Sequence, residues 1–236
     1  ETLIQDYPNT SLLYNISGVC YKALGQLEEA VKRYEQALAI KPDYAEAHNN
    51  LGNTLHELGQ LDAAVKSYEH ALAIKPDYAE AQCNLGLTFQ ELGQLEKAVK
   101  RYEQALTIKP DYAEAHYNLG NTLQELGQLE KAVKRYEQAL SIKPDYAGAH
   151  NNLGNSLNEL DQLEGAVKRY EQALAIKPDY AEAHNNLGLT RQELGQMDAA
   201  VKSFEQALAI KPDYADAHYN LGVTLKELGQ LEEAVK

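Results

Sequence analysis

The sequence predicts an all-α protein built as an array of helical hairpins. The first observation is a 34-residue period that all seven prolines follow: Pro8, Pro42, Pro76, Pro110, Pro144, Pro178 and Pro212. The second is that apolar residues within a period recur at steps of three and four, as on one face of a helix, without strand-like alternation. A period of this length is typical of repeat proteins whose stacked units share one continuous core.

The period divides the chain into six complete repeats and one partial repeat. Residues 1–10 match the end of a preceding repeat. The complete repeats are residues 11–44, 45–78, 79–112, 113–146, 147–180 and 181–214, and the partial repeat is 215–236. Because the chain starts and stops inside a repeat, we expect it to be a piece of a longer protein.

The first helix of a repeat is clearest in residues 45–58. Its inward stripe is Ala47, Leu51, Thr54, Leu55 and Leu58. Asp43 and Glu46 are placed as an acidic N-cap and its partner in a capping box, and Pro42 discourages the previous helix from continuing. Gly52 costs the helix up to about 1 kcal/mol relative to alanine, so its recurrence predicts the close approach of another helix. The equivalent glycines are Gly18, Gly86, Gly120, Gly154, Gly188 and Gly222.

Gly59 predicts a left-handed stop, after which a second helix runs from about Leu61 to Ile74. Its buried stripe is Leu61, Ala64, Val65, Tyr68, Ala71 and Leu72. On the opposite face Asp62 and Lys66 are spaced to form an ion pair worth about 0.3–0.5 kcal/mol, and the other repeats have the same spacing. This face is therefore interpreted as solvated.

The composition excludes several classes of partner. The net charge is −13 and no cluster of Lys or Arg occurs, which argues against nucleic acid and anionic membranes. No apolar stretch approaches the roughly 20 residues of a membrane span, and residues 1–10 lack signal-peptide features. Cys20 and Cys83 lie too far apart in a stacked array for a disulfide. They are expected to be free thiols in a reducing compartment, which favours a cytoplasmic location.

No catalytic, cofactor or metal site is predicted. Histidine recurs at the fourth position of the repeat, as His48, His116, His150, His184 and His218. Equivalent positions in successive repeats are separated by at least the roughly 8–10 Å between packed helices, whereas a metal holds its ligands at about 2 Å. These histidines are therefore interpreted as half-buried packing residues. No nucleophile–base set or phosphate-binding loop is present, so we expect a protein that is not an enzyme.

The repeat resembles the tetratricopeptide repeat (TPR). The residues that carry the resemblance in the second repeat are Leu51, Gly52, Leu55, Ala64, Tyr68, Ala71 and Pro76, and the same set returns along the chain. The resemblance implies a right-handed superhelical solenoid of antiparallel helix hairpins that binds protein or peptide partners. Three departures are Arg191 at an apolar position, Asp161 in place of the turn glycine, and Gly165 inside a helix. They predict that the fifth and sixth repeats are the softest region.

By the same resemblance, the polar side of each first helix lines a concave groove. Counted from the first residue of each repeat, this side holds positions two, five, six, nine, twelve and thirteen. Position six is Asn50, Asn84, Asn118, Asn152, Asn186 and Asn220. Position nine adds Asn53, Asn121 and Asn155. Position five is Asn15, Asn49, Cys83, Tyr117, Asn151, Asn185 and Tyr219.

An asparagine side chain carries two donors and an acceptor, so a row of amides matches the backbone of an extended peptide. Such a row is similar to that in the TPR region of O-linked N-acetylglucosamine transferases. The alternative is that these amides bond to neighbouring helices or to water. Chaperone-binding TPR proteins clamp a terminal carboxylate with Lys or Arg, but here position two is acidic, as in Glu46 and Glu80. The groove should therefore favour neutral or basic segments.

Three functions follow as hypotheses. The first is a scaffold that binds an extended peptide or a partner helix in its groove. The second is the substrate-presenting region of a larger transferase. The third is end-to-end self-association through an uncovered stripe of Leu221, Leu225 and Leu228.

Overall fold

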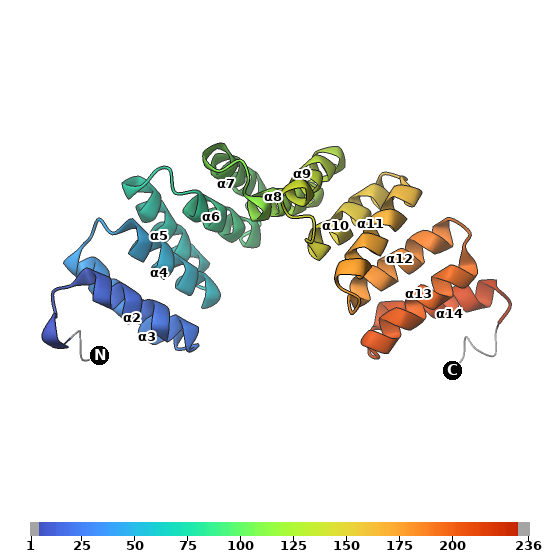
Figure 1. Cartoon of the computed structure of the whole chain (residues 1–236), viewed down its shortest axis with the longest axis horizontal. Helices are drawn as coiled ribbons and strands as arrows, with labels where there is room; N and C mark the ends of the chain where they lie inside the picture. The colour runs from blue at the N-terminus through green and yellow to red at the C-terminus, as the bar shows by residue number, and fades with distance from the viewer. Residues whose placement is uncertain (1–4, 231–236) are drawn as a thin grey trace. The chain divides into compact units, whose positions relative to one another are not determined.

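The computed structural model describes residues 5–230, which contain thirteen complete α-helices and no strand (Figure 1). The first helices of the repeats are α2 (Ser11–Ala23), α4 (Ala45–Glu57), α6 (Ala79–Glu91), α8 (Ala113–Glu125), α10 (Ala147–Glu159), α12 (Ala181–Glu193) and α14 (Ala215–Glu227). The second helices are α3 (Leu27–Ile40), α5 (Leu61–Ile74), α7 (Leu95–Ile108), α9 (Leu129–Ile142), α11 (Leu163–Ile176) and α13 (Met197–Ile210). The predicted all-α hairpin array is confirmed.

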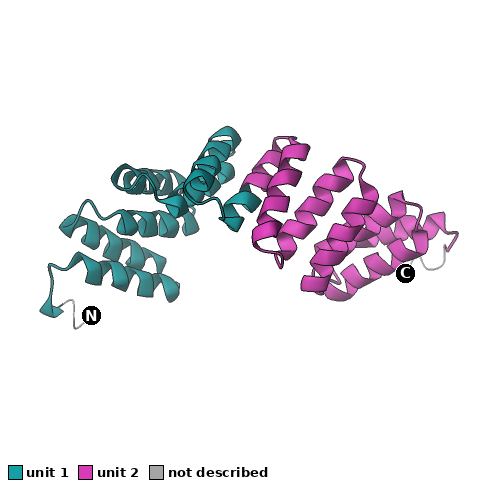
Figure 2. Ribbon diagram, turned by 45° about the horizontal axis from the view of Figure 1, so that its top comes forward, with its two compact units in different colours: residues 1–118 teal, residues 119–236 magenta. Residues whose placement is uncertain are grey.

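The chain forms two compact units, residues 1–118 and 119–236, with the boundary inside α8 (Figure 2). Within each unit, a first helix packs mainly against the second helix of its own repeat, and next against the second helix of the preceding repeat. Successive first helices also touch, as α4 does with α6 and α10 with α12. The hairpins of a unit therefore share one continuous core.

The recurring glycine of the first helix makes room for an aromatic ring of the second helix. A Cβ atom added at Gly52 would lie 2.6 Å from the ring of Tyr68, which is 1% exposed. The other repeats have the same pairing, with Phe204 as the ring in the sixth. The close approach predicted from these glycines is confirmed, and the approaching group is a buried ring of the same repeat.

The turn between the two helices also follows the prediction. Gly59 has a φ of +72°, in the left-handed region, and ends α4. The glycines of the other turns have similar values, whereas Asp161 adopts a φ of +58° in the fifth repeat. Asp161 is thus the one non-glycine residue with positive φ in the described part of the chain.

The predicted capping box is wrong. The N-cap of α4 is Tyr44, and no side chain caps the helix. His48 instead donates a hydrogen bond from Nε2 to the Pro42 carbonyl at 2.9 Å. The same bond joins His116 to Pro110, His150 to Pro144, His184 to Pro178, and His218 to Pro212. The fourth-position histidine therefore ties the first turn of the helix to the loop before it.

The predicted ion pairs on the outer face do not form as expected. In the first repeat, Lys32 pairs with Glu29 at 2.6 Å and not with Glu28, the residue four positions before it that has the predicted spacing. Asp62 and Lys66 make no ion pair in the region that the structure describes. Solvated side chains at this spacing gain too little from pairing to fix one geometry.

Candidate functional site

The predicted site residues lie along the first helices, on the side that carries positions two, six, nine, twelve and thirteen, here called the groove face. The position-five asparagines Asn15, Asn49, Asn151 and Asn185 are buried beneath it. Those of positions six and nine are half-buried. Tyr117 is half-buried as well, but Tyr219 is 73% exposed.

Within each unit the asparagines are linked from one repeat to the next. In the first unit, Asn50 donates from Nδ2 to Asn15 at 3.1 Å, and Asn84 donates to Asn49 at 3.3 Å and to Asn53 at 2.9 Å. In the second, the bonds run from Asn152 to Asn121 (2.9 Å), from Asn186 to Asn151 (3.3 Å) and Asn155 (3.0 Å), and from Asn220 to Asn185 (3.1 Å). In every case position six donates to the preceding repeat. Bonding to neighbouring helices therefore accounts for these amide donors.

The three position-nine asparagines are each held by a core tyrosine, and in the fourth repeat Tyr136 donates its hydroxyl to Asn121 Oδ1 at 2.9 Å. Tyr68 donates its hydroxyl to Asn53 Oδ1 at 2.8 Å, and Tyr170 does the same to Asn155 Oδ1 at 2.8 Å. Each Oδ1 thus accepts two hydrogen bonds, one from the tyrosine and one from the next position-six asparagine. This pattern fixes the orientation of both amides.

The fixed amides leave hydrogen-bonding groups unused. The Nδ2 atoms of Asn84 and Asn186 each donate to two acceptors. The Oδ1 atoms of these two residues have no partner among residues 5–230. The Nδ2 atoms of Asn53 and Asn155 likewise have no partner in that range. Each unit therefore presents one free amide N–H₂ group beside one free amide carbonyl.

Both amide pairs lie in hollows on the groove face. The hollow of the first unit has a volume of about 310 Å³ and is lined by Lys22, Asn53, His56, Glu57, Tyr68, Asn84 and Leu87. That of the second unit has a volume of about 200 Å³ and is lined by Asn155, Asn158, Glu159, Tyr170, Asn186, Leu189, Thr190 and Glu193. In both, asparagine at position nine is followed by leucine at position nine of the next repeat. The chain therefore builds one kind of site twice.

The position-thirteen glutamates receive a contact from position twelve of the preceding repeat. Lys22 lies 3.2 Å from Glu57, and His56 lies 3.1 Å from Glu91. In the second unit Gln124 donates to Glu159 at 2.8 Å and Asn158 donates to Glu193 at 3.0 Å. These glutamates remain exposed, so their negative charge stays available on the groove face.

From the sequence, Thr54 was placed on the inward stripe and position twelve on the groove side, but the hydrogen bonds that these two groups make were not predicted. The position-ten threonines are fully buried, and Thr54 donates to the backbone carbonyl of Asn50 at 2.9 Å. Thr88, Thr190 and Thr224 do the same to Asn84, Asn186 and Asn220. The position-twelve donors were the second group. Their recurrence at the 34-residue step was the available signal, but their partners lie in another repeat.

The buried tyrosines and the buried cysteine near the asparagines are neutral at neutral pH. Burial raises the pKa of Tyr68 and Tyr170 above the ordinary tyrosine value. Burial also raises the pKa of the Cys83 thiol to about 11, against hydrogen bonds with Tyr112 and Asn118 that lower it. Cys83 is buried and Cys20 is exposed, and both are free thiols, as predicted.

No group of three or more His, Cys, Asp or Glu side chains could hold a metal ion among residues 5–230. None of the helices there combines the length and the apolar character that crossing a bilayer requires.

Comparison with known proteins identifies the family. A family model described as "TPR repeat" matches residues 18–59, 52–93, 88–127, 120–161, 154–195 and 191–229. A search of curated proteins found no match. Solved structures with a similar fold include Cut9 in its complex with Hcn1, with a TM-score of 0.79 and 18% identity over 95% of this chain. This chain spans 44% of that one.

Two further structures are matched over nearly their whole length. YrrB, described as a TPR protein with an unusual peptide-binding site, has a TM-score of 0.67 and 22% identity over 79% of this chain and 96% of its own. MamA has a TM-score of 0.65 and 27% identity over 70% of this chain and 96% of its own. The family model covers almost all of the described residues, and the structural matches have the same hairpin fold. The protein therefore belongs to the TPR repeat family.

Proposed function

We propose that the groove face binds an extended peptide segment of a partner protein, with the two hollows as its main contact points. TPR proteins generally mediate protein interactions, which sets the class of function. YrrB is described as having a peptide-binding site, but a likeness of 22% identity concerns the fold alone. The proposal therefore depends on the side chains of this chain.

The observation that carries the proposal is the pair of unused amide groups in each hollow. A peptide unit needs one donor for its carbonyl and one acceptor for its N–H group. Asn53 supplies the donor and Asn84 the acceptor in the first unit, and Asn155 and Asn186 supply them in the second. Because their internal hydrogen bonds already fix these amides, a ligand would not have to order them.

The charge of the groove face favours neutral or basic segments. The hollow of the second unit contains Glu159 and Glu193 and no cationic side chain. In the first unit Glu57 is paired with Lys22. A lysine-containing peptide should therefore prefer the second hollow, and its affinity should fall as salt is added, because salt screens exposed charges. Titration of the same peptide at two salt concentrations tests this, and a salt-independent affinity would contradict it.

The main test replaces the free donors while keeping the internal bonds. In an Asn53→Asp/Asn155→Asp variant, the carboxylates can still accept from the tyrosines and from Asn84 and Asn186, but the free N–H₂ groups are gone. Each lost hydrogen bond is worth about 0.5–1.5 kcal/mol, so affinity for a neutral peptide should fall roughly 5- to 150-fold. The probe is a fluorescently labelled peptide selected from a random library on the wild-type chain.

The matched control is Asn84→Asp/Asn186→Asp, which removes the donors used inside the protein. This variant should lose thermal stability, whereas Asn53→Asp/Asn155→Asp should retain it. Unchanged peptide affinity in the latter variant, with the fold intact, would show that the amides serve only to join the repeats.

Two alternatives have less support. The stripe expected to drive end-to-end self-association is partly covered, because Leu225 is only 5% exposed. The exposed apolar face lies instead on α2, where Leu12, Ile16 and Val19 are 52%, 48% and 48% exposed. Light scattering of the wild type and of Ile16→Asn across a concentration series would detect association through that face. Nothing among the described residues favours a substrate-presenting role in a transferase.

A further inference from the structure

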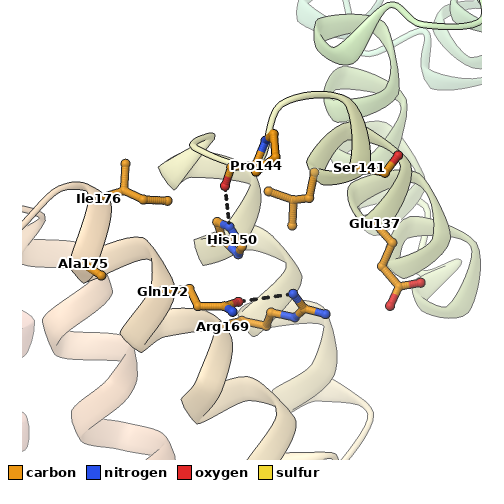
Figure 3. A pocket seen from close by; sticks show the side chains of 9 residues that line it. Glu137, Ser141, Pro144, His150, Arg169, Gln172, Ala175 and Ile176 are labelled. Atoms are coloured by element: carbon orange, nitrogen blue, oxygen red, sulfur yellow. Dashed lines mark hydrogen bonds between the residues drawn. The ribbon is translucent and has the colours of Figure 1, made fainter.

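A larger hollow lies away from the groove face, between the second helices α9 and α11 of the second unit (Figure 3). Its volume is about 550 Å³, within the range of ligand-binding pockets. Leu140, Pro144 and Ile176 supply apolar surface, and Glu137, Arg169 and His150 are among its polar residues. The hollow is thus apolar with a few polar groups, as in sites that bind a side chain.

Arg169 brings a positive charge to this hollow that no carboxylate of the described chain neutralises. Its guanidinium group donates to Gln172 Oε1 at 3.2 Å, one turn along the same helix, and it pairs with no carboxylate among residues 5–230. Figure 3 shows Arg169 beside Gln172, with Glu137 across the hollow on α9. An arginine with most of its donors free suits a planar carboxylate, which it can bind with two parallel hydrogen bonds.

Repeats two, three and six have no such free cation at the corresponding place, whereas Arg135 of repeat four donates to Gln138 at 3.1 Å much as Arg169 donates to Gln172. Repeat two has Ser67 there, and His48 stacks on His70 at a centroid distance of 5.3 Å. In repeat three, Arg101 donates to both Gln82 and Gln104. In repeat six the residue is Ser203, which accepts from Arg191, and Arg191 also pairs with Glu171 at 2.9 Å. The free guanidinium therefore distinguishes the α9–α11 hollow from these three.

His150 adds an acceptor at the base of the hollow. The ring is 6% exposed and donates from Nε2 to the Pro144 carbonyl at 3.0 Å, so Nδ1 carries a lone pair. Nδ1 is buried and has no hydrogen-bond partner in the described chain. Burial lowers the pKa of His150, and nearby Arg169 lowers it further, against the bond to Pro144. The ring is therefore neutral at neutral pH and does not compete with Arg169 for an anion.

We propose that the α9–α11 hollow binds an acidic segment of a partner polypeptide, in which an Asp or Glu carboxylate pairs with Arg169. A large apolar side chain next to that carboxylate lies against Leu140, Pro144 and Ile176. This charge preference is opposite to that of the groove face, so the two surfaces select different segments. The inference is independent of the peptide site on the groove face, because no residue is shared.

The test uses two peptides that differ only in charge. Acetyl-Leu-Asp-amide and acetyl-Leu-Asn-amide are titrated into the full chain and followed by NMR. The Asp peptide should bind at least about tenfold more tightly, shift backbone signals of α9 and α11, and shift the ring signals of His150, which are assigned with His150→Gln. Equal affinity of the two peptides, no binding of the Asp peptide, or shifts confined to the groove face would overturn the proposal.

Three variants locate the effect. Arg169→Ser, which installs the residue found here in repeats two and six, should abolish the preference for the Asp peptide. Arg101→Ser, at the same position of repeat three, should leave it unchanged. Glu137→Gln removes a negative charge from the lining and should strengthen binding of the Asp peptide a few-fold. Because Glu137 is exposed, this variant tests the proposal even if Arg169→Ser lowers stability. Retained preference in Arg169→Ser, or weaker binding in Glu137→Gln, would count against the proposal.

Discussion

Two glycines of the fifth repeat have opposite surroundings, and substitution by alanine should have opposite effects. A Cβ atom at Gly154 would lie 2.6 Å from the Tyr170 ring, so Gly154→Ala should destabilise by about 1–3 kcal/mol through overpacking. At Gly165 the nearest atom is Leu157 Cδ1, at an ordinary 3.5 Å, so Gly165→Ala should stabilise by about 1 kcal/mol through helix propensity. Thermal melts of the two variants, compared with the wild type, check the signs.

Asp161 occupies a turn position that glycine holds in the other repeats. Its φ of +58° lies in the left-handed region, where a residue with a Cβ atom is strained. Asp161→Gly should therefore stabilise by about 0.5–1 kcal/mol, while Gly127→Asp should destabilise the preceding repeat by a similar amount. Denaturant unfolding of both variants would test this, and a loss of stability in Asp161→Gly would show that the carboxylate has a structural role.

The two thiols should react very differently. Cys20 is exposed, whereas Cys83 is buried and has a pKa raised to about 11. The thiolate is the reactive form, so at pH 8 an alkylating agent should modify Cys20 and leave Cys83 intact. Mass spectrometry of the treated protein checks the site. Modification of Cys83 at a comparable rate in folded protein would mean that α6 opens readily.

At the scale of helices, the sixth repeat has its arginine on the first helix instead of the second. Arg191 lies on α12 and contacts Ser203 on α13, and we call these two residues the exchanged pair. Repeats four and five have leucine at the first of these positions and arginine at the second, as in Leu157 and Arg169. Ser203→Arg alone would bring a second guanidinium to the place where Arg191 now bonds at 2.9 Å, and should destabilise. Adding Arg191→Leu should restore stability, with a coupling energy of about 0.5–3 kcal/mol. Unfolding of the two single variants and the double variant measures it, and additive effects would refute the pairing.

The contacts of this exchanged pair concern the prediction that repeats five and six are the least stable part of the chain. From the sequence, Arg191 was a charge on an apolar stripe, but in the structure it bonds to Ser203 and Glu171. The substitution at position 203 was visible in the sequence, yet the contact of Arg191 with Glu171 spans two repeats. Hydrogen exchange of α12 and α13 against α4 and α5 would measure the softness directly.

The helices and turns followed from the sequence because their determinants are local. Apolar spacing, glycine and proline lie within one hairpin, so the second helix was predicted at about Leu61 to Ile74, and α5 has these bounds. The capping box failed because α4 begins after Tyr44, and His48 rather than Asp43 satisfies the loop. The site was predicted only in part. The asparagines were found by their recurrence, but which of their amide groups remain unused depends on contacts with Tyr68 and with the next repeat.

At the scale of the whole molecule, the buried tyrosines should make the fold sensitive to alkali. Burial raises the pKa of Tyr34 from 10.0 to about 12, and raises those of Tyr68 and Tyr170 as well. The unfolded chain would lose these protons first, so this contribution to stability is complete below pH 10 and declines as the pH rises toward 12. Melting temperatures measured from pH 7 to pH 11 should fall steeply above pH 10.

The control for this prediction is Tyr68→Phe, which repeat six already has at Phe204. It removes one titrating group, so the alkaline decline should become shallower even though the bond to Asn53 is lost at every pH. An unchanged slope would assign the decline to other groups.

The asparagine bonds also have a direction. Within each unit, the position-six amides of repeats two, three, five, six and seven donate toward the start of the chain, while the position-twelve side chains contact the following repeat. A repeat therefore gives one kind of contact to its predecessor and another to its successor. A duplicated internal repeat would meet matching groups on both sides, because the junctions within each unit use the same two kinds of contact. Because these bonds all point the same way along the chain, whole 34-residue repeats can be added without leaving a donor or acceptor of these bonds unmatched. This is consistent with a chain whose repeats are near copies of one another.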